Sequence, residues 1–282
     1  MASHPEIILL CVFPAAPGGG NPAPIIPDAS GLNAEAMRQI AAQHGHESGF
    51  VLPPEDPRSA DRRFRFFVPE HEMEMCGHAT LGAAWLLRRC GEAPGAVLRI
   101  ETLSGPVRAI FAGDAVEVTQ PQGQAEPLAN IAQVLAALGL ERADLADAPV
   151  QNAATSRVKT LVPVRDLARL HALAPDPAAV RAACEAIGST GLYPYALSGE
   201  ATAHARQFPR NSGYPEDAAT GIAATALYAG LLALGAAPPC LTVRQGEAMG
   251  RPSAIEVRPN PDGSGLLLSG RVELLDAITR PA

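Results

Sequence analysis

The sequence predicts an α+β protein made of two similar halves, and two short segments carry most of that prediction. The first is Cys76-Gly-His-Ala-Thr-Leu-Gly-Ala-Ala-Trp-Leu-Leu87, and the second is Glu216-Asp-Ala-Ala-Thr-Gly-Ile-Ala-Ala-Thr-Ala-Leu227. Each places small polar residues, with a thiol, imidazole or carboxylate among them, directly before an apolar helix. A helix that is apolar on nearly every side has to be buried. The order of strands and helices around the two segments is similar, which indicates an internal duplication.

The first half alternates strands with two helices. Apolar runs and alternating patterns predict the strands, the latter most clearly where Phe64 and Phe66 alternate with arginines. Gly18 to Pro24 predicts a loop, and Gly91 ends the buried helix. The predicted strands are residues 6–13, 50–52, 64–68, 97–103 and 107–111, and the predicted helices are residues 33–44 and 78–89.

The second half repeats this order after a crossing at residues 121–127, where prolines and glycine interrupt any periodicity. Helices are predicted at residues 126–138, 177–186 and 221–234, and strands at residues 158–163, 193–197, 202–208, 241–245, 254–258 and 266–274. We therefore expect domains at residues 1–122 and 123–265, with the strand region 266–282 completing the first half.

Composition limits the classes of function. The chain has 282 residues, of which 47% are hydrophobic and 18% charged, and its net charge is −7. This composition is typical of a folded soluble protein, and it lacks the basic footprint of a nucleic-acid-binding protein. Five scattered cysteines without CxxC spacing, Cys11, Cys76, Cys90, Cys184 and Cys240, indicate reduced thiols rather than disulfides or zinc. We expect a cytoplasmic protein with no membrane segment, signal peptide, metal or dinucleotide cofactor.

Three places carry side chains suited to proton transfer or substrate binding. Glu47 lies among small residues ahead of a strand, where it is either an acid/base group or a simple turn residue. Cys76 and His78 begin the first buried helix, whose dipole favours a thiolate or a bound anion. Alternatively, Cys76 is a small apolar core residue and His78 caps the helix. Asp217 is either part of the same chemistry or an N-cap of the second helix.

Eight segments in order resemble the PhzF-like phenazine-biosynthesis isomerase family, within the wider diaminopimelate epimerase-like fold. They are Gly20-Asn-Pro22, His46-Glu-Ser48 with Phe50-Val-Leu-Pro53, Arg65 to Pro69, Glu72 to Thr80, Glu101-Thr102 with Gly105, Ala205-Arg-Gln-Phe208, Glu216-Asp217 with Thr220-Gly221, and Gln245-Gly246 with Gly250-Arg-Pro-Ser253. The resemblance implies two α+β halves, each a mixed or antiparallel sheet wrapped around a central apolar helix, with the substrate between them.

The resemblance also implies a mechanism and the residues that carry it. The family moves a proton on a small carboxylate substrate by acid/base catalysis, without metal or cofactor, and its members are often homodimers. Its catalytic glutamate matches Glu47, its histidine matches His78, and its aspartate matches Asp217. The resemblance further implies substrate binding at the positions Gly77, Cys76, Gly221 and Ile222.

The sequence departs from the family pattern at two positions and leaves alternatives open. Ala218 replaces the usual proline, and Ile222 replaces a serine, so one hydroxyl donor is missing. Proline racemases and diaminopimelate epimerases use two thiols, and the second would fall near Ala218. We therefore expect an isomerase. The alternatives are an amino-acid racemase or epimerase that uses Cys76 as one base, and a non-catalytic carboxylate-binding protein.

Overall fold

The structure, a computed structural model, describes residues 5–278 and divides into two compact units. Among the described residues, unit 1 comprises those up to Pro14, Asn21–Thr119 and those from Ser269 onwards. Unit 2 comprises Ala15–Gly20 and Gln120–Leu268. The predicted first domain, residues 1–122, includes residues 15–20, which the structure assigns to unit 2. The prediction also covers residues 1–4 and 279–282, which lie outside the described residues.

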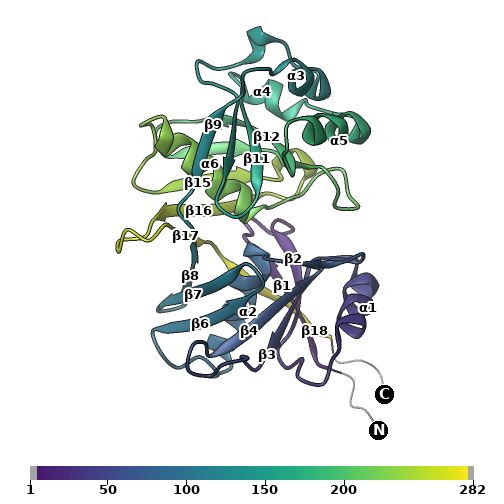
Figure 1. Ribbon diagram of the computed structural model, residues 1–282, viewed down its shortest axis with the longest axis vertical. Helices are drawn as coiled ribbons and strands as arrows, with labels where there is room; N and C mark the ends of the chain where they lie inside the picture. Colours follow the sequence, from purple (N-terminus) through teal and green to yellow (C-terminus); the bar gives the residue numbers. More distant parts are fainter. Residues whose placement is uncertain (1–4, 279–282) are drawn as a thin grey trace. The chain divides into compact units, whose positions relative to one another are not determined.

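Unit 1 is a sheet with two helices (Figure 1). In chain order its elements are β1 (Ile7–Val12), β2 (Asn21–Ile26), α1 (Ala34–His44), β3 (Ser48–Leu52), β4 (Arg62–Phe67), β5 (Glu72–Met73), α2 (Gly77–Arg89), β6 (Val97–Thr102), β7 (Gly105–Ala112), β8 (Ala115–Gln120) and β18 (Val272–Ile278). The strands pair in the order β18, β1, β2, β3, β4, β6, β7, β8, and β5 pairs with β4. The pairs β2–β3 and β4–β6 are parallel, and the others are antiparallel.

Helix α2 forms the crossover between β4 and β6 and packs against β1, β2, β3 and β18. Ten of its thirteen residues are buried, and small residues let the strands approach. A Cβ added at Gly82 would lie 3.2 Å from Val12 Cγ2 and 3.3 Å from Leu10 Cδ1, which is tight for van der Waals contact. Helix α1 packs against β3 and β4, so the sheet wraps the apolar α2 while α1 covers another part of it.

Unit 2 repeats this plan with more helices. Its elements are β9 (Gln124–Pro127), α3 (Ala132–Leu138), η1 (Arg142–Asp144), β10 (Gln151–Ala154), β11 (Val158–Pro163), α4 (Leu167–His171), α5 (Pro177–Ala186), β12 (Gly191–Leu197), β13 (Thr202–Ala205), β14 (Phe208–Pro209), α6 (Gly221–Ala233), β15 (Leu241–Gln245), η2 (Glu247–Met249), β16 (Ser253–Pro259) and β17 (Leu266–Ser269). Strands β9, β10, β11, β12, β13, β15 and β16 pair in that order, with β11–β12 and β13–β15 parallel.

The central helix of unit 2 is α6, the crossover between β13 and β15. It packs against β9, β10, β11 and β16, and its first eleven residues are buried. Helices α3, α4 and α5 gather at one end of the unit (Figure 1) and share a second apolar core. Each unit therefore has a parallel crossover around one apolar helix within a mixed sheet, which confirms the predicted α+β fold class.

The predicted strand 202–208 is divided into β13 and β14, and three further predicted elements differ from the observed ones. The predicted loop 18–24 is a strand from Asn21, which pairs with β1. Pro22 and Pro24 have no N–H to donate, and they are tolerated because β2 pairs with β3 only at Ile25–Ile26. The predicted helix 126–138 is wrong at its start, since residues up to Pro127 pair with β10. Helix α3 begins at Ala132, whose N–H donates to Asn130 Oδ1 over 3.1 Å.

The third difference is the predicted strand 266–274, which is two strands. β17 ends at Ser269 and β18 begins at Val272. The division between the units falls at the end of β17, and β18 pairs with β1 in unit 1. Periodicity alone does not show this break, because both segments are apolar.

Candidate active site

The side chains of Glu47, Cys76 and His78 lie together in unit 1. Cys76 Sγ donates to Glu47 Oε2 over 3.2 Å and lies 3.4 Å from His78 Nδ1. His78 Nδ1 is also 3.4 Å from Glu47 Oε2. The His78 side chain is 5% exposed and that of Glu47 is 18% exposed, so the carboxylate keeps access to solvent while the imidazole is enclosed.

Two elements, β3 and α2, bring these side chains together. Glu47 directly precedes β3, following the turn in which Gly45, at a φ of 66°, ends α1. Cys76 is the N-cap of α2, and His78 is the second residue of that helix. Thr80 fixes the N-cap, because its hydroxyl donates to the Cys76 carbonyl over 2.7 Å and its N–H donates to the same oxygen over 3.0 Å.

An ion pair holds the hairpin that leads into α2. Arg65 on β4 donates from Nε and Nη2 to both oxygens of Glu72 on β5, over 2.7 and 2.6 Å. The two hydrogen bonds raise the pKa of Arg65 above its ordinary value, and the guanidinium also lies over the Phe67 ring. A bidentate arginine–carboxylate pair fixes geometry as well as charge, so the segment from Glu72 to Cys76 has a defined path.

The start of α2 favours negative charge. The Cys76 side chain makes no capping hydrogen bond, and the first turn contains no acidic residue. The backbone N–H groups of the first turn, including those of Gly77 and His78, have no partner within the helix, and the helix dipole adds positive potential there. These features would stabilise a carboxylate or thiolate beside Cys76.

Unit 2 places Asp217 in a second polar cluster at the start of α6. The Thr220 hydroxyl donates to Asp217 Oδ2 over 2.5 Å, and Gln245 Nε2 donates to the Asp217 carbonyl over 2.7 Å. Tyr193 donates to Gln245 Oε1 over 2.9 Å. The N-cap of α6 is Thr220, without a side-chain capping bond, so the alternative in which Asp217 caps this helix is wrong.

The remaining predicted residues lie beside Asp217. Gly221 opens α6, and a Cβ added there would lie 2.7 Å from Leu268 Cδ2. Ile222 is 7% exposed, and Ala218 is 1% exposed. Unit 1 thus gathers Glu47, Cys76, His78 and Gly77, while unit 2 gathers Asp217, Gly221 and Ile222.

Two buried residues near Asp217, Arg206 and Gln207, were not predicted as functional residues from the sequence. Arg206 donates to Glu216 over 2.8 and 2.6 Å, and the two side chains are 9% and 11% exposed. Gln207 accepts the Asp217 N–H at its carbonyl. Its buried amide nitrogen and oxygen have no hydrogen-bond partner in the part of the chain that the structure describes. The one sequence feature that pointed to Arg206 and Gln207 was their place in the family-like segment Ala205-Arg-Gln-Phe208.

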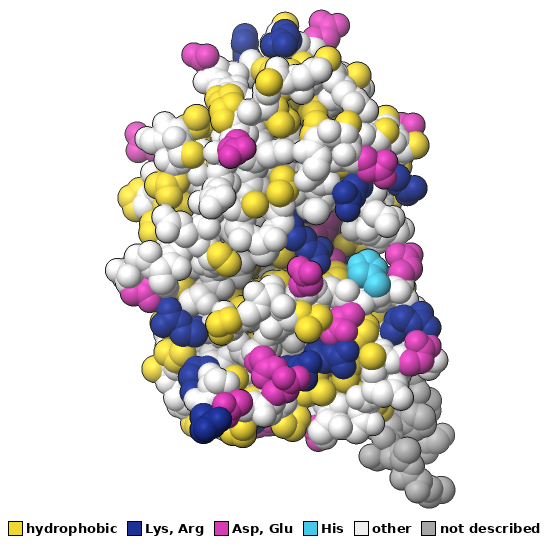
Figure 2. Space-filling model, in the orientation of Figure 1, with side chains coloured by type: hydrophobic (Ala, Val, Ile, Leu, Met, Phe, Trp, Pro, Cys, Tyr) yellow, Lys and Arg dark blue, Asp and Glu magenta, His cyan; other side chains and the backbone are white. Residues whose placement is uncertain are grey.

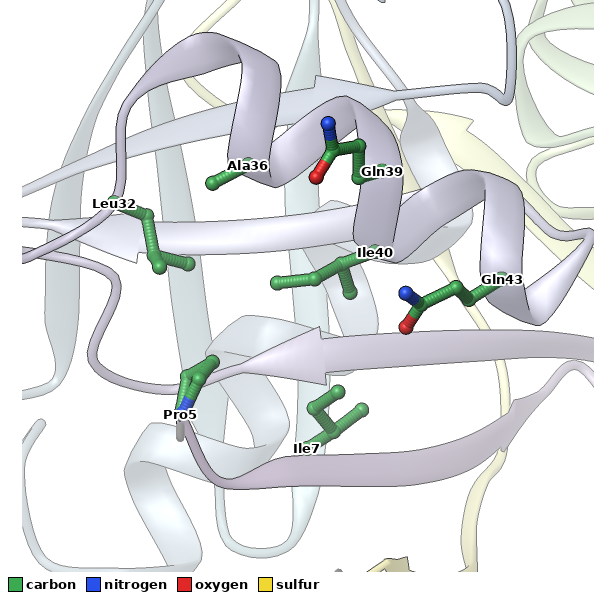
Figure 3. Close-up of a pocket in the computed structure, with 7 residues that line it drawn as sticks. All are labelled: Pro5, Ile7, Leu32, Ala36, Gln39, Ile40 and Gln43. Atoms are coloured by element: carbon green, nitrogen blue, oxygen red, sulfur yellow. The ribbon is translucent and has the colours of Figure 1, made fainter. Parts of the chain in front are cut away.

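Unit 1 also has an open pocket that is separate from the titratable cluster (Figure 3). It has a volume of about 180 Å³ and lies between α1 and β1, where the side chains of Ile7 and Ile40 point towards it. Its other lining residues are Pro5, Leu32, Ala36, Gln39 and Gln43. No lining side chain is ionisable, so this pocket offers no acid/base chemistry.

On the face drawn in Figure 2, acidic and basic side chains are interspersed rather than separated into regions of one sign. Several of the charged pairs are exposed, such as Arg58 with Asp56 and Arg271 with Glu273. Among residues 5–278, no helix combines the length and apolar character that crossing a membrane requires.

Comparison with known proteins identifies the family. The model of the phenazine biosynthesis-like protein family, PhzC-PhzF, matches residues 10–271. An "Uncharacterized isomerase" from Deinococcus radiodurans is 31% identical over 270 residues, covering 90% of this chain and 87% of that protein. A Bacillus anthracis phenazine biosynthesis protein of the PhzF family superposes with a TM-score of 0.85 at 27% identity, covering 96% and 97% of the two chains.

The fold extends to a more distant group. A probable proline racemase from Agrobacterium radiobacter superposes with a TM-score of 0.64 at 14% identity, covering 99% of this chain and 93% of that one. At this identity the likeness concerns the fold alone, which is the epimerase-like fold that the sequence predicted. The chain therefore belongs to the PhzC-PhzF family of phenazine biosynthesis-like proteins and is an isomerase.

Proposed function

We propose that the protein is a cofactor-independent isomerase that moves a proton between two carbons of a small carboxylate substrate. The observation that supports this proposal is the cluster of Glu47, Cys76 and His78, in which three ionisable side chains lie within hydrogen-bonding range at the start of a buried helix. Glu47 is the acid/base group, because its carboxylate is the most exposed of the three and so is accessible to a substrate.

The proton transfer conserves the composition of the substrate. Glu47 takes a proton from a carbon next to an activating group, and the electron pair of the broken C–H bond delocalises into that group. The protonated Glu47 then returns the proton to another carbon, so that a double bond changes position. His78 holds the substrate by a hydrogen bond, and the N–H of Gly77 binds an oxygen on which negative charge develops.

The proposal also gives roles to Asp217 and Gly221, which lie at the start of α6 in unit 2. Following the family resemblance, we assign the Asp217 carboxylate to an amino or hydroxyl group of the substrate, and the N–H of Gly221 to the substrate carboxylate. Ile222 replaces a hydroxyl-bearing residue, which favours a substrate with an apolar group at that position. The small-molecule substrate, the cytoplasmic location and a homodimer remain parts of this proposal.

An epimerase is the second candidate, because Cys76 is the N-cap of α2, where the helix dipole favours a thiolate that can act as a base. In a two-base epimerisation, one group removes a proton from one face of a carbon and the other delivers a proton to the opposite face. The Cys76 thiol, which is 3.2 Å from Glu47 Oε2, would therefore have to separate from this carboxylate so that the substrate carbon lies between them. The described chain has an alanine at position 218, where the two-thiol enzymes would have their second cysteine, so the partner base would be Glu47.

Hydrogen–deuterium exchange followed by proton NMR tests the proposal. The protein in D₂O would be mixed with amino acids, hydroxy acids and dihydro-hydroxyanthranilate, and compared with Glu47→Gln and with the control Glu70→Gln, which alters an exposed acid. We expect deuterium to enter a substrate carbon with the wild type and control, and roughly 10²–10⁴-fold more slowly with Glu47→Gln. Exchange that is unchanged in Glu47→Gln would contradict the mechanism. Line broadening without exchange would favour the non-catalytic binding protein.

A further inference from the structure

A second group of ionisable side chains lies wholly within unit 2 and has no part in the proposed proton transfer. It consists of His171, His204 and Glu247. His204 Nδ1 is 2.6 Å from Glu247 Oε2, and His171 Nε2 is 3.4 Å from the same oxygen. The imidazole rings are 6.3 Å apart, with an angle of 72° between their planes. All three ligand atoms lie within 4.8 Å of one another.

We propose that His171, His204 and Glu247 form a binding site for a divalent transition-metal ion of the zinc class. Two imidazole nitrogens and one carboxylate are a donor set that suits zinc and its neighbours better than calcium or magnesium, which prefer oxygen ligands. Three protein ligands also leave coordination positions open to water.

The spacing of the ligand atoms fits this assignment. With metal–ligand bonds of about 2.1 Å, neighbouring ligands of a tetrahedral site lie about 3.4 Å apart, which is the separation of His171 Nε2 and Glu247 Oε2. The shorter contact, between His204 and Glu247, is a hydrogen bond. A metal ion would replace the proton in this hydrogen bond and release it to solvent, and the carboxylate would move away from the ring by about 0.8 Å.

The backbone of each ligand residue is held in place. His171 ends α4, and its carbonyl accepts from Arg206 Nη1 over 3.1 Å. His204 lies in β13 between two strands, paired with Ala196 of β12 and Arg244 of β15. Glu247 begins η2 directly after Gly246, whose φ of 75° and close approach to neighbouring backbone fix the turn. Because the three backbones are fixed, ion binding requires only side-chain movement.

The site is also accessible from solvent. The exposed fractions of the side chains are 35% for His171, 16% for His204 and 27% for Glu247. A bound ion would connect α4, β13 and η2, which are distant in sequence, and should therefore stabilise unit 2.

Zinc titration of the tag-free, chelator-treated protein tests the site. Isothermal titration calorimetry and native mass spectrometry should show one tightly bound Zn²⁺ per chain, with Co²⁺ giving the visible absorption of a site with nitrogen and oxygen ligands. We expect His171→Ala and Glu247→Gln each to weaken Zn²⁺ binding by at least about 10-fold and to remove the rise in melting temperature that Zn²⁺ causes in the wild type.

Two controls make the result specific. His71→Ala removes an exposed histidine elsewhere and should leave Zn²⁺ binding unchanged. Among residues 5–278, Glu47, Cys76 and His78 are the other group that could hold a metal, and the double variant Cys76→Ser/His78→Asn, which removes two of these ligands, should also retain the tight site. The proposal is overturned if the wild type binds no Zn²⁺, or if His171→Ala and Glu247→Gln bind Zn²⁺ as tightly as the wild type does. His171→Ala alters the most exposed of the three side chains, and circular dichroism without metal checks that it folds.

Discussion

Cys76 Sγ and Glu47 Oε2 are 3.2 Å apart, although 29 residues separate them in the sequence. The contact joins the start of β3 to the start of α2, two elements of unit 1 that pack against each other. It therefore places a thiol and a carboxylate at the same helix N-terminus, and the role of the thiol decides between the two candidate reactions.

Cys76→Ala should separate an isomerase from an epimerase. An isomerase that uses Glu47 alone should keep its rate within about 10-fold, because the thiol contributes only a hydrogen bond. A two-base epimerase should lose about 10²-fold or more. Single-turnover rates on the substrate found by deuterium exchange provide the measurement, and Cys90→Ala, at an exposed thiol, is the control. A loss of 10²-fold or more would favour epimerisation.

Asp217→Asn should weaken substrate binding more than it weakens the fold. The variant removes negative charge while preserving shape, so a substrate amino or hydroxyl group should bind with a KM raised about 10-fold. Thr220→Val removes the hydroxyl that donates to Asp217 and serves as the matched control. If both variants lose the same stability and both retain wild-type KM, Asp217 is a structural residue.

Glu216→Gln should destabilise unit 2. It removes the negative partner of Arg206, whose side chain is 9% exposed, and leaves this buried charge with neutral carbonyl acceptors only. We expect a loss of about 3 kcal/mol in the free energy of unfolding, measured by urea denaturation. The exposed pair Arg58–Asp56 supplies the control, because Asp56→Asn should leave the urea midpoint unchanged. Equal effects would show that burial of the Arg206 pair is unimportant.

Gly246→Ala and Gly250→Ala form a second matched pair. Both glycines have positive φ, 75° and 68°, so each alanine should cost about 1 kcal/mol for the backbone conformation. A Cβ at Gly246 would also lie 2.2 Å from the Arg251 carbonyl oxygen, whereas at Gly250 no atom lies within 4 Å. We expect Gly246→Ala to lose about 1–3 kcal/mol more than Gly250→Ala in the same urea experiment. Equal losses would mean that the turn relaxes without cost.

The thiols should differ in reactivity towards iodoacetamide. Burial raises the pKa of Cys184 to about 11, so at pH 8 this thiol is almost entirely protonated and enclosed. Cys90 and Cys240 are exposed and should be alkylated first, because only an accessible thiolate attacks the reagent. Peptide mass spectrometry over a time course would show the order, and early modification of Cys184 in the folded protein would contradict it.

The sequence alone predicted the elements that local patterns determine. The two apolar helices were evident because nearly every side of each is apolar. α5 was predicted at its observed limits, residues 177–186, and the structure shows that Asp176 caps it and Pro177 begins it. The start of α3 and the break between β17 and β18 could not be predicted, since strand pairing with distant segments decides both.

The residues of the candidate site were named from motifs, whereas only the tertiary structure decided which side chains meet. Contact between Glu47 and Cys76 requires β3 to pack beside α2, and no local pattern specifies that packing. The same holds for His171, His204 and Glu247, which come from three separate segments and carry no metal-binding spacing in the sequence. Local sequence determines where helices and strands form, but side chains far apart in the chain converge only when burial of the apolar helices fixes the sheet around them.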